Sequence, residues 1–130
     1  MGILGFNCNG WPFANAYGAP HADFIIEGIE VNEATEPLNN IQVLAKSGWK
    51  DNEGFIHYSD GNIVYTQIDG KFKHFLGDPG GHYKIIVNDT SNVYQSDSLD
   101  IQAHFKNGKG TWYYGSDSTY VEIVLKKNEE

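Results

Sequence analysis

The chain has 130 residues, of which 40% are hydrophobic and 20% charged, a composition typical of one globular domain rather than a disordered segment. Nine basic and seventeen acidic residues give a formal net charge of −8, which disfavours nucleic acid and an anionic membrane surface as direct partners. No apolar run approaches the length of a membrane-spanning helix, and the single cysteine excludes an intrachain disulfide.

The N-terminal stretch, residues 1–21, contains no Asp, Glu, Lys or Arg and mixes Gly, Asn, Ala and Pro with aromatic residues that include Trp11, Phe13 and Tyr17. This stretch shows neither helical nor alternating periodicity, which indicates a flexible, uncharged tether. We therefore expect a tether over 1–21, one domain over 22–127 and a short C-terminal tail over 128–130.

The expected domain consists of short segments rich in β-branched and aromatic residues, separated by turns of Gly, Asn, Asp and Pro. These predicted strands cover 22–31, 41–47, 62–68, 71–76, 82–88, 99–105 and 119–125. No segment keeps an apolar stripe of helical period over a helix-length window. The pattern predicts an all-β fold, an antiparallel β-sandwich of about seven strands.

Two local patterns sharpen this prediction. Asp69-Gly70 is the best hairpin signal in the chain and lies between the strands predicted at 62–68 and 71–76. The segment 99–105 alternates most clearly and predicts one buried face: Leu99, Ile101, Ala103 and Phe105. The last strand repeats this scheme with Val121, Ile123 and Leu125 pointing inward.

Catalytic patterns are weak. The five histidines have no metal-type spacing and are interpreted as scattered surface residues: His21, His57, His74, His82 and His104. No G-x-S-x-G elbow occurs, and Cys8 lies in the tether without a neighbouring base. The sequence therefore favours a protein without enzymatic activity and with no required cofactor.

Acidic turns could collect oxygen ligands for calcium. The "NDTSN" and "SDSLD" segments supply the candidates Asp89, Asp97 and Asp100. Asp is also common in turns because its side chain hydrogen-bonds the local backbone, and no EF-hand pattern is present. A calcium ion at these residues would have a structural role, and both interpretations stay open.

The segment 110–120, "GTWYYGSDSTY", concentrates aromatic residues next to glycines. Exposed rings beside polar groups can stack on sugars or anchor a protein partner, which makes Trp112, Tyr113 and Tyr114 candidate ligand-binding residues. The alternative is that part of this group caps the open end of the sandwich.

The order of these parts resembles the carboxypeptidase regulatory-like, or transthyretin-like, β-sandwich, a fold close to the immunoglobulin-like sandwiches. The matching segments are Gly28 to Val31, Pro37 to Val43, Thr66 to Phe72 and Tyr83 to Val87. The entry motif from Tyr17 to Phe24, "YGAPHADF", is similar to that of the radical SAM-associated lipoproteins of gut Bacteroidetes.

The resemblance implies an address in the cell envelope, either anchored to the outer membrane or exported. In such a protein, Cys8 in "ILGFNC" would carry the lipid, although Asn7 departs from the small residue preferred before that cysteine. An unmodified thiol is the alternative. Membrane contact is then expected only through this anchor.

We expect a monomeric, non-enzymatic cell-envelope domain that binds or scaffolds a protein or glycan partner. A carbohydrate-binding module that uses the loop 110–120 is the first alternative. An enzyme with a concave polar pocket is the second. A self-crosslinking adhesin repeat is the third, and it would need a buried lysine, asparagine and acid together.

Overall fold

The computed structural model describes residues 20–110 and 112–129, which form eight strands and, within those ranges, no helix long and apolar enough to cross a membrane. The strands are β1 (His21–Asn32), β2 (Gln42–Lys50), β3 (Ile56–Tyr58), β4 (Asn62–Tyr65), β5 (Lys71–Leu76), β6 (His82–Asn88), β7 (Asp97–Gln102) and β8 (Tyr113–Leu125). The predictions for Cys8 and for most of the tether fall on residues 1–19, outside the described residues.

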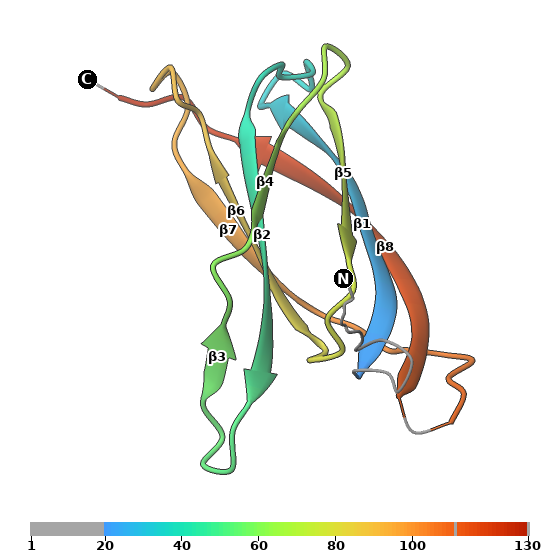
Figure 1. Ribbon diagram of the computed structural model, residues 1–130. Helices are drawn as coiled ribbons and strands as arrows, with labels where there is room; N and C mark the ends of the chain where they lie inside the picture. The colour runs from blue at the N-terminus through green and yellow to red at the C-terminus, as the bar shows by residue number, and fades with distance from the viewer. Residues whose placement is uncertain (1–19, 111, 130) are drawn as a thin grey trace, which may run out of the picture.

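Two twisted sheets face each other (Figure 1). One sheet has the order β5-β1-β8, and the other has the order β3-β2-β6-β7, with β4 pairing beside β3 along the same edge of β2. The all-β sandwich prediction is confirmed, with eight strands instead of about seven. All pairs are antiparallel except β1–β8, which joins the two ends of the domain in parallel register from Asp23↔Ser116 to Asn32↔Leu125.

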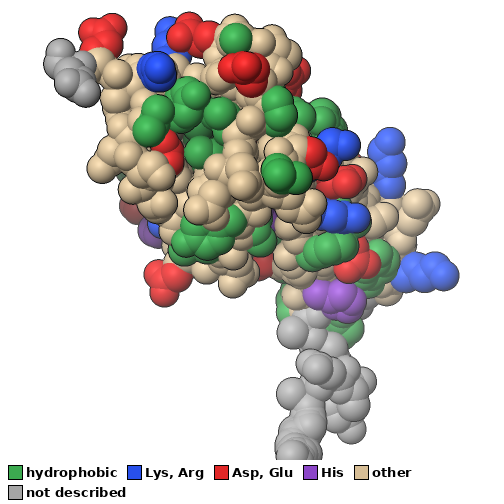
Figure 2. Space-filling model, turned by 90° about the horizontal axis from the view of Figure 1, so that it is seen from above, with side chains coloured by type: hydrophobic (Ala, Val, Ile, Leu, Met, Phe, Trp, Pro, Cys, Tyr) green, Lys and Arg blue, Asp and Glu red, His purple; other side chains and the backbone are tan. Residues whose placement is uncertain are grey.

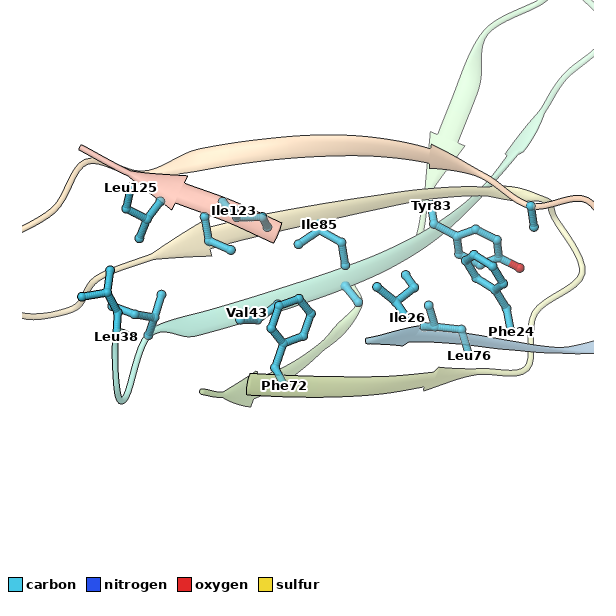
Figure 3. Close-up of a cluster of buried hydrophobic side chains, with 14 residues drawn as sticks. Phe24, Ile26, Leu38, Val43, Phe72, Leu76, Tyr83, Ile85, Ile123 and Leu125 are labelled. Carbon is cyan, nitrogen blue, oxygen red and sulfur yellow. The ribbon is translucent and has the colours of Figure 1, made fainter. Parts of the chain in front are cut away.

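The core lies between the two sheets, because alternate residues of β1, β5 and β6 point inward. Phe24 of β1 stacks on Tyr83 of β6 with ring centroids 4.4 Å apart, which joins the sheets near one end of the sandwich (Figure 3). The Tyr83 hydroxyl donates a hydrogen bond to the Asp78 carbonyl at 2.6 Å. Burial, followed by the charge of Asp78, raises the pKa of Tyr83 to about 12.

The predicted hairpin at Asp69-Gly70 is wrong in its strand pairing. A tight turn does form, with the Gly70 N–H donating to the Gln67 carbonyl at 2.8 Å and Gly70 at a φ of 78°. However, β4 pairs with β2 in one sheet, whereas β5 pairs with β1 in the other. The turn is a corner between sheets, because a local turn signal reverses the chain without choosing the strand's neighbour.

The strand predicted at 99–105 is shorter than expected. It ends at Gln102, and Leu99 is 38% exposed because β7 is an edge strand. Ala103 is buried just beyond the strand. In β8, Ile123 and Leu125 are buried as predicted.

The interpretation of all histidines as surface residues is wrong for His74. This side chain is 3% exposed on the inner face of β5, and its Nε2 lies 3.0 Å from the Val43 carbonyl of the opposite sheet. Burial lowers the pKa of His74, and the hydrogen bond to Val43 opposes this shift. The neutral ring is therefore part of the core.

Candidate functional site

The hairpin formed by the end of β2 and by β3 projects at one end of the sandwich (Figure 1). It carries three large exposed side chains: Trp49 is 54% exposed, Phe55 66% and Ile56 38%. Large apolar side chains are normally buried in the core of a sandwich, so a group of them on a projecting hairpin indicates an interaction surface. We call residues 49–58 the aromatic hairpin.

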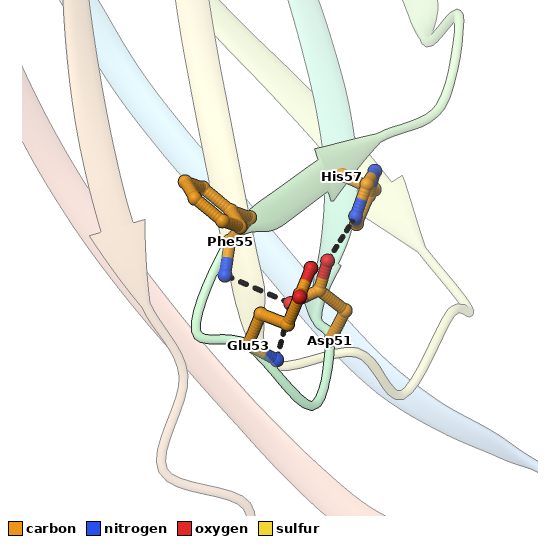
Figure 4. A network of polar contacts seen from close by, with 4 residues as sticks. All are labelled: Asp51, Glu53, Phe55 and His57. Carbon is orange, nitrogen blue, oxygen red and sulfur yellow. Dashed lines mark hydrogen bonds and ion pairs between the residues drawn. The ribbon is translucent and has the colours of Figure 1, made fainter.

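A network around Asp51 shapes the turn of the aromatic hairpin (Figure 4). Its Oδ1 accepts hydrogen bonds from the backbone N–H groups of Glu53 and Phe55, both at 2.9 Å. Its Oδ2 lies 2.6 Å from Nε2 of His57. The hydrogen bond to His57, followed by that from Phe55, lowers the pKa of Asp51 and keeps it ionised.

The same network positions the exposed rings. Trp49 and His57 are opposite each other in the β2–β3 register, and their rings stack with centroids 5.3 Å apart and an interplanar angle of 26°. Because Asp51 holds His57, it also fixes the surface on which Trp49 rests. The aromatic hairpin therefore offers ordered rings, which lose little conformational entropy when a partner covers them.

Sequence reasoning missed this hairpin, because β3 has only three residues and follows directly on β2. The signal that could have found it is the turn "DNEG" between "GWK" and "FIHY". Gly54 adopts a φ of 93° there, as the last residue of a three-residue hairpin loop requires.

The predicted ligand-binding residues lie where β8 begins. Trp112 is 47% exposed and Tyr114 50%, whereas the Tyr113 hydroxyl donates to Oδ2 of Asp23 at 3.0 Å. That hydrogen bond raises the pKa of Tyr113. Adjacent strand residues point to opposite faces, so Tyr113 and Tyr114 do not form one flat strip. Their role in binding stays a prediction.

The predicted calcium residues do not come together. Asp89 is buried and accepts the backbone N–H groups of Ser91, Val93 and Tyr94, which makes it the organiser of its own loop. Asp100 lies 3.7 Å from Nζ of Lys84. In the described part of the chain, no three His, Cys, Asp or Glu side chains form a group that could hold a metal ion.

Glu30 is a second feature that sequence reasoning missed. Its carboxyl group is fully buried between the sheets, and neither oxygen has a hydrogen-bond partner among the described residues. Burial, followed by the negative charge of Asp97, raises the pKa of Glu30 to about 8. Strand parity could have revealed it, because Glu30 follows Phe24, Ile26 and Gly28 on the same face of β1.

A buried acid is one of the three groups that a self-crosslinking repeat needs. Among the described residues, however, no lysine is buried. Glu30 therefore has no buried lysine beside it with which such a crosslink could form, and we interpret it as a core carboxyl.

A depression of about 410 Å³ lies on the outside of the β5-β1-β8 sheet. Its lining residues are Asp23, Phe24, Ile25, Phe75, Leu76 and Gly77. Asp23 is the one charged side chain in that lining, and it already accepts the Tyr113 hydroxyl. This depression therefore does not present the convergent polar groups expected of an active site.

No protein-family model and no curated protein matches the chain. Among solved structures, it is similar to hydroxyquinol 1,2-dioxygenase from Pseudomonas putida DLL-E4, with 9% identity over 90% of this chain and 64% of that chain and a TM-score of 0.54. Catechol 1,2-dioxygenase from Pseudomonas arvilla C-1 gives 9% identity, coverages of 87% and 59% and a TM-score of 0.53.

Catechol 1,2-dioxygenase from Acinetobacter sp. ADP1 aligns with 11% identity over 85% of this chain and 59% of that chain, at a TM-score of 0.53. The chain spans less than two thirds of the length of these dioxygenases. At such low identity, the likeness shows a shared β-sandwich fold alone.

Proposed function

We propose that the chain is a non-enzymatic domain of the cell envelope that binds or scaffolds a partner protein through the aromatic hairpin. The observation that carries the proposal is the exposure of Trp49 and Phe55 on a projecting, internally braced turn. Large aromatic side chains of this kind supply most of the binding energy at protein interfaces. The envelope address rests on the resemblance of the entry motif to the radical SAM-associated lipoproteins.

The character of the surface supports a protein partner over nucleic acid. In the face shown in Figure 2, hydrophobic side chains are interspersed with acidic and lysine side chains, and the whole chain carries a net charge of −8. A nucleic-acid partner would require a concentrated basic face.

Affinity capture from an envelope extract tests this proposal. The immobilised full chain should retain a protein that the double variant Trp49→Ala/Phe55→Ala releases. Tyr65→Ala is the matched control, because Tyr65 is 49% exposed on β4 of the same sheet but lies outside the hairpin. Equal retention by all three forms would contradict the proposal.

The exposure of Trp112 and Tyr114 favours one second candidate, a carbohydrate-binding module. An oligosaccharide at one hundred times its dissociation constant should stabilise the fold by about 2.7 kcal/mol, which a thermal unfolding scan resolves. In this case Trp112→Ala should abolish the shift and Trp49→Ala should leave it unchanged. No shift with neutral and acidic oligosaccharides would remove this candidate.

A further inference from the structure

The outer edge of β8 is covered at two places. At one end Ser116 exchanges backbone hydrogen bonds with Lys106, at 2.8 and 2.9 Å. At the other end the Lys126 carbonyl accepts the Gln95 N–H at 2.8 Å. On its inner edge β8 pairs with β1 along this whole stretch. We call the edge between these two covered positions, Ser118–Val124, the open window.

Strand geometry identifies the backbone groups that the open window presents. Ser116 and Lys126 both direct backbone groups away from β1, and no register shift occurs between them. Every second residue between them points the same way, namely Ser118, Tyr120, Glu122 and Val124. Among the described residues, the N–H groups of the last three have no acceptor, whereas the Ser118 N–H donates to Oδ1 of Asp117.

The two edges of this sheet differ in their protection against strand addition. β5, the opposite edge, carries the exposed lysines Lys71 and Lys73, and edge lysines discourage pairing with another strand. The open window contains neither lysine nor proline, and Tyr120 is 62% exposed and Val124 49%. Glu122 is its single charged residue, so the window is a strand edge with strong β-propensity and little protection against an added strand.

We propose that the open window binds an extended peptide segment of a partner protein, which adds a strand to the sheet beside β8. The backbone of such a peptide supplies hydrogen-bond partners for the outward N–H and C=O groups of Tyr120, Glu122 and Val124. A short segment fits between Lys106 and Gln95 and can leave the sheet at both ends. The 13-residue β8 of a second copy would instead run into these covering segments.

The surroundings define the kind of segment that fits. Leu99 is opposite the buried Ile85 in the β6–β7 register, so it faces the core side of the sandwich, and yet it is 38% exposed. Apolar side chains on one face of the added strand would cover Leu99. Side chains on its other face would lie beside Tyr120 and Glu122, where a basic residue is favoured. The expected segment therefore alternates apolar and basic or polar residues.

Amide hydrogen exchange of the full chain, followed by NMR, tests the premise. The amides of Tyr120, Glu122 and Val124 should exchange quickly, whereas those of Thr119, Val121 and Ile123, which face β1, should exchange slowly. Slow exchange of the first three in a monomer would mean that the chain's own N-terminal residues cover the window. Slow exchange in a dimer would mean that a second copy does. Either result overturns the proposal.

The heptapeptide Lys-Val-Lys-Val-Lys-Val-Lys is the probe for binding. Added to the full chain, it should slow exchange at Tyr120, Glu122 and Val124. Two N-methylated forms of the peptide, one methylated at the valines and one at the inner lysines, should differ in affinity, because only one set of peptide N–H groups faces β8. The form that loses those groups should bind about tenfold or more weakly.

Two variants at one position separate backbone pairing from charge. Glu122→Pro removes an outward N–H that the β1 ladder does not use, and it should weaken binding about tenfold. Glu122→Gln keeps that N–H and removes only the exposed charge, so it should weaken binding by no more than a few-fold. Equal affinity of both N-methylated peptides, chemical-shift changes confined to the aromatic hairpin or no binding at all would overturn the proposal. Because the open window lies in the other sheet, this test is independent of the hairpin variants.

Discussion

The buried carboxyl group of Glu30 makes the stability of the fold depend on pH. This group has no hydrogen-bond partner among the described residues and titrates near 8 in the folded chain, against 4.5 for the free group. Between these values the folded state holds a proton that the unfolded state has lost. Stability therefore falls as the pH rises through this window, by about 1.4 kcal/mol per pH unit at most.

Glu30→Gln should remove this loss. We expect the wild type to lose about 3 kcal/mol of unfolding free energy between about pH 5 and about pH 8, and the variant to show no such loss, because an amide does not ionise. Urea unfolding at both pH values measures the difference. Glu27→Gln, a change at an exposed residue of the same strand, is the control, and parallel pH curves for all three proteins would contradict the assignment.

His74 has the opposite pH dependence. Its pKa is lowered by burial, so the unfolded state binds a proton more readily than the folded state as the pH falls below about 6.5. In the wild type, acidification lowers the unfolding free energy through His74 and raises it through Glu30, so the two effects oppose each other. In the Glu30→Gln background, stability should therefore rise between about pH 5 and about pH 7. A fall over that range, measured by urea unfolding, would show that His74 does not control it.

At the scale of the strands, β1 and β5 pack too closely for a side chain at Gly28. A Cβ there would lie 2.5 Å from the Phe72 ring and 2.7 Å from the Val121 carbonyl. Gly28→Ala should therefore destabilise the fold by about 2–4 kcal/mol, as overpacking of a core does. In Gly77→Ala, the nearest atom would be 3.7 Å away, and the cost should stay below about 1 kcal/mol. Similar unfolding free energies for both variants would contradict this packing.

The aromatic hairpin should loosen locally when its carboxylate is removed. Asp51→Ala leaves the N–H groups of Glu53 and Phe55 without their acceptor and frees His57. We expect faster amide exchange across residues 51–57 and little change in the midpoint of global unfolding, because the hairpin projects from the core. A large drop in the midpoint would instead show that the hairpin supports the sandwich.

The strands show what the sequence could predict. Alternation located most of them, because a half-buried strand must alternate inward and outward residues. The parallel pairing of β1 with β8 joins segments about ninety residues apart, and no local pattern encodes it. The same limit applies to the Asp69-Gly70 turn, whose flanking strands belong to different sheets.

The candidate site was harder to predict than the fold. Trp49 and Phe55 lie outside every strand predicted from the sequence, and only the pairing of β2 with β3, which puts Trp49 opposite His57, shows that they belong to a hairpin. Asp89 shows the same limit for a polar residue, because only the structure reveals that three backbone N–H groups donate to its carboxylate. In both cases the function of a residue depends on which groups the tertiary structure has already satisfied.

At the scale of the whole molecule, the two ends of the sandwich differ. The aromatic hairpin projects at one end, and the turn between β4 and β5 lies at the other (Figure 1). That turn carries Ile68, which is 84% exposed. Exposed apolar side chains therefore occur at both ends, and in the hairpin the Asp51–His57 contact and the stacking of Trp49 on His57 hold an exposed ring in place.

Site-specific photo-crosslinking tests the central claim most directly. The photoreactive residue p-benzoylphenylalanine would replace Phe55 in one variant and Ile68 in the other, and both would be irradiated in an envelope extract. A binding surface at the hairpin predicts a discrete crosslinked protein from position 55 and none from position 68. Crosslinks from both positions alike, or from neither, would contradict a partner held on the aromatic hairpin.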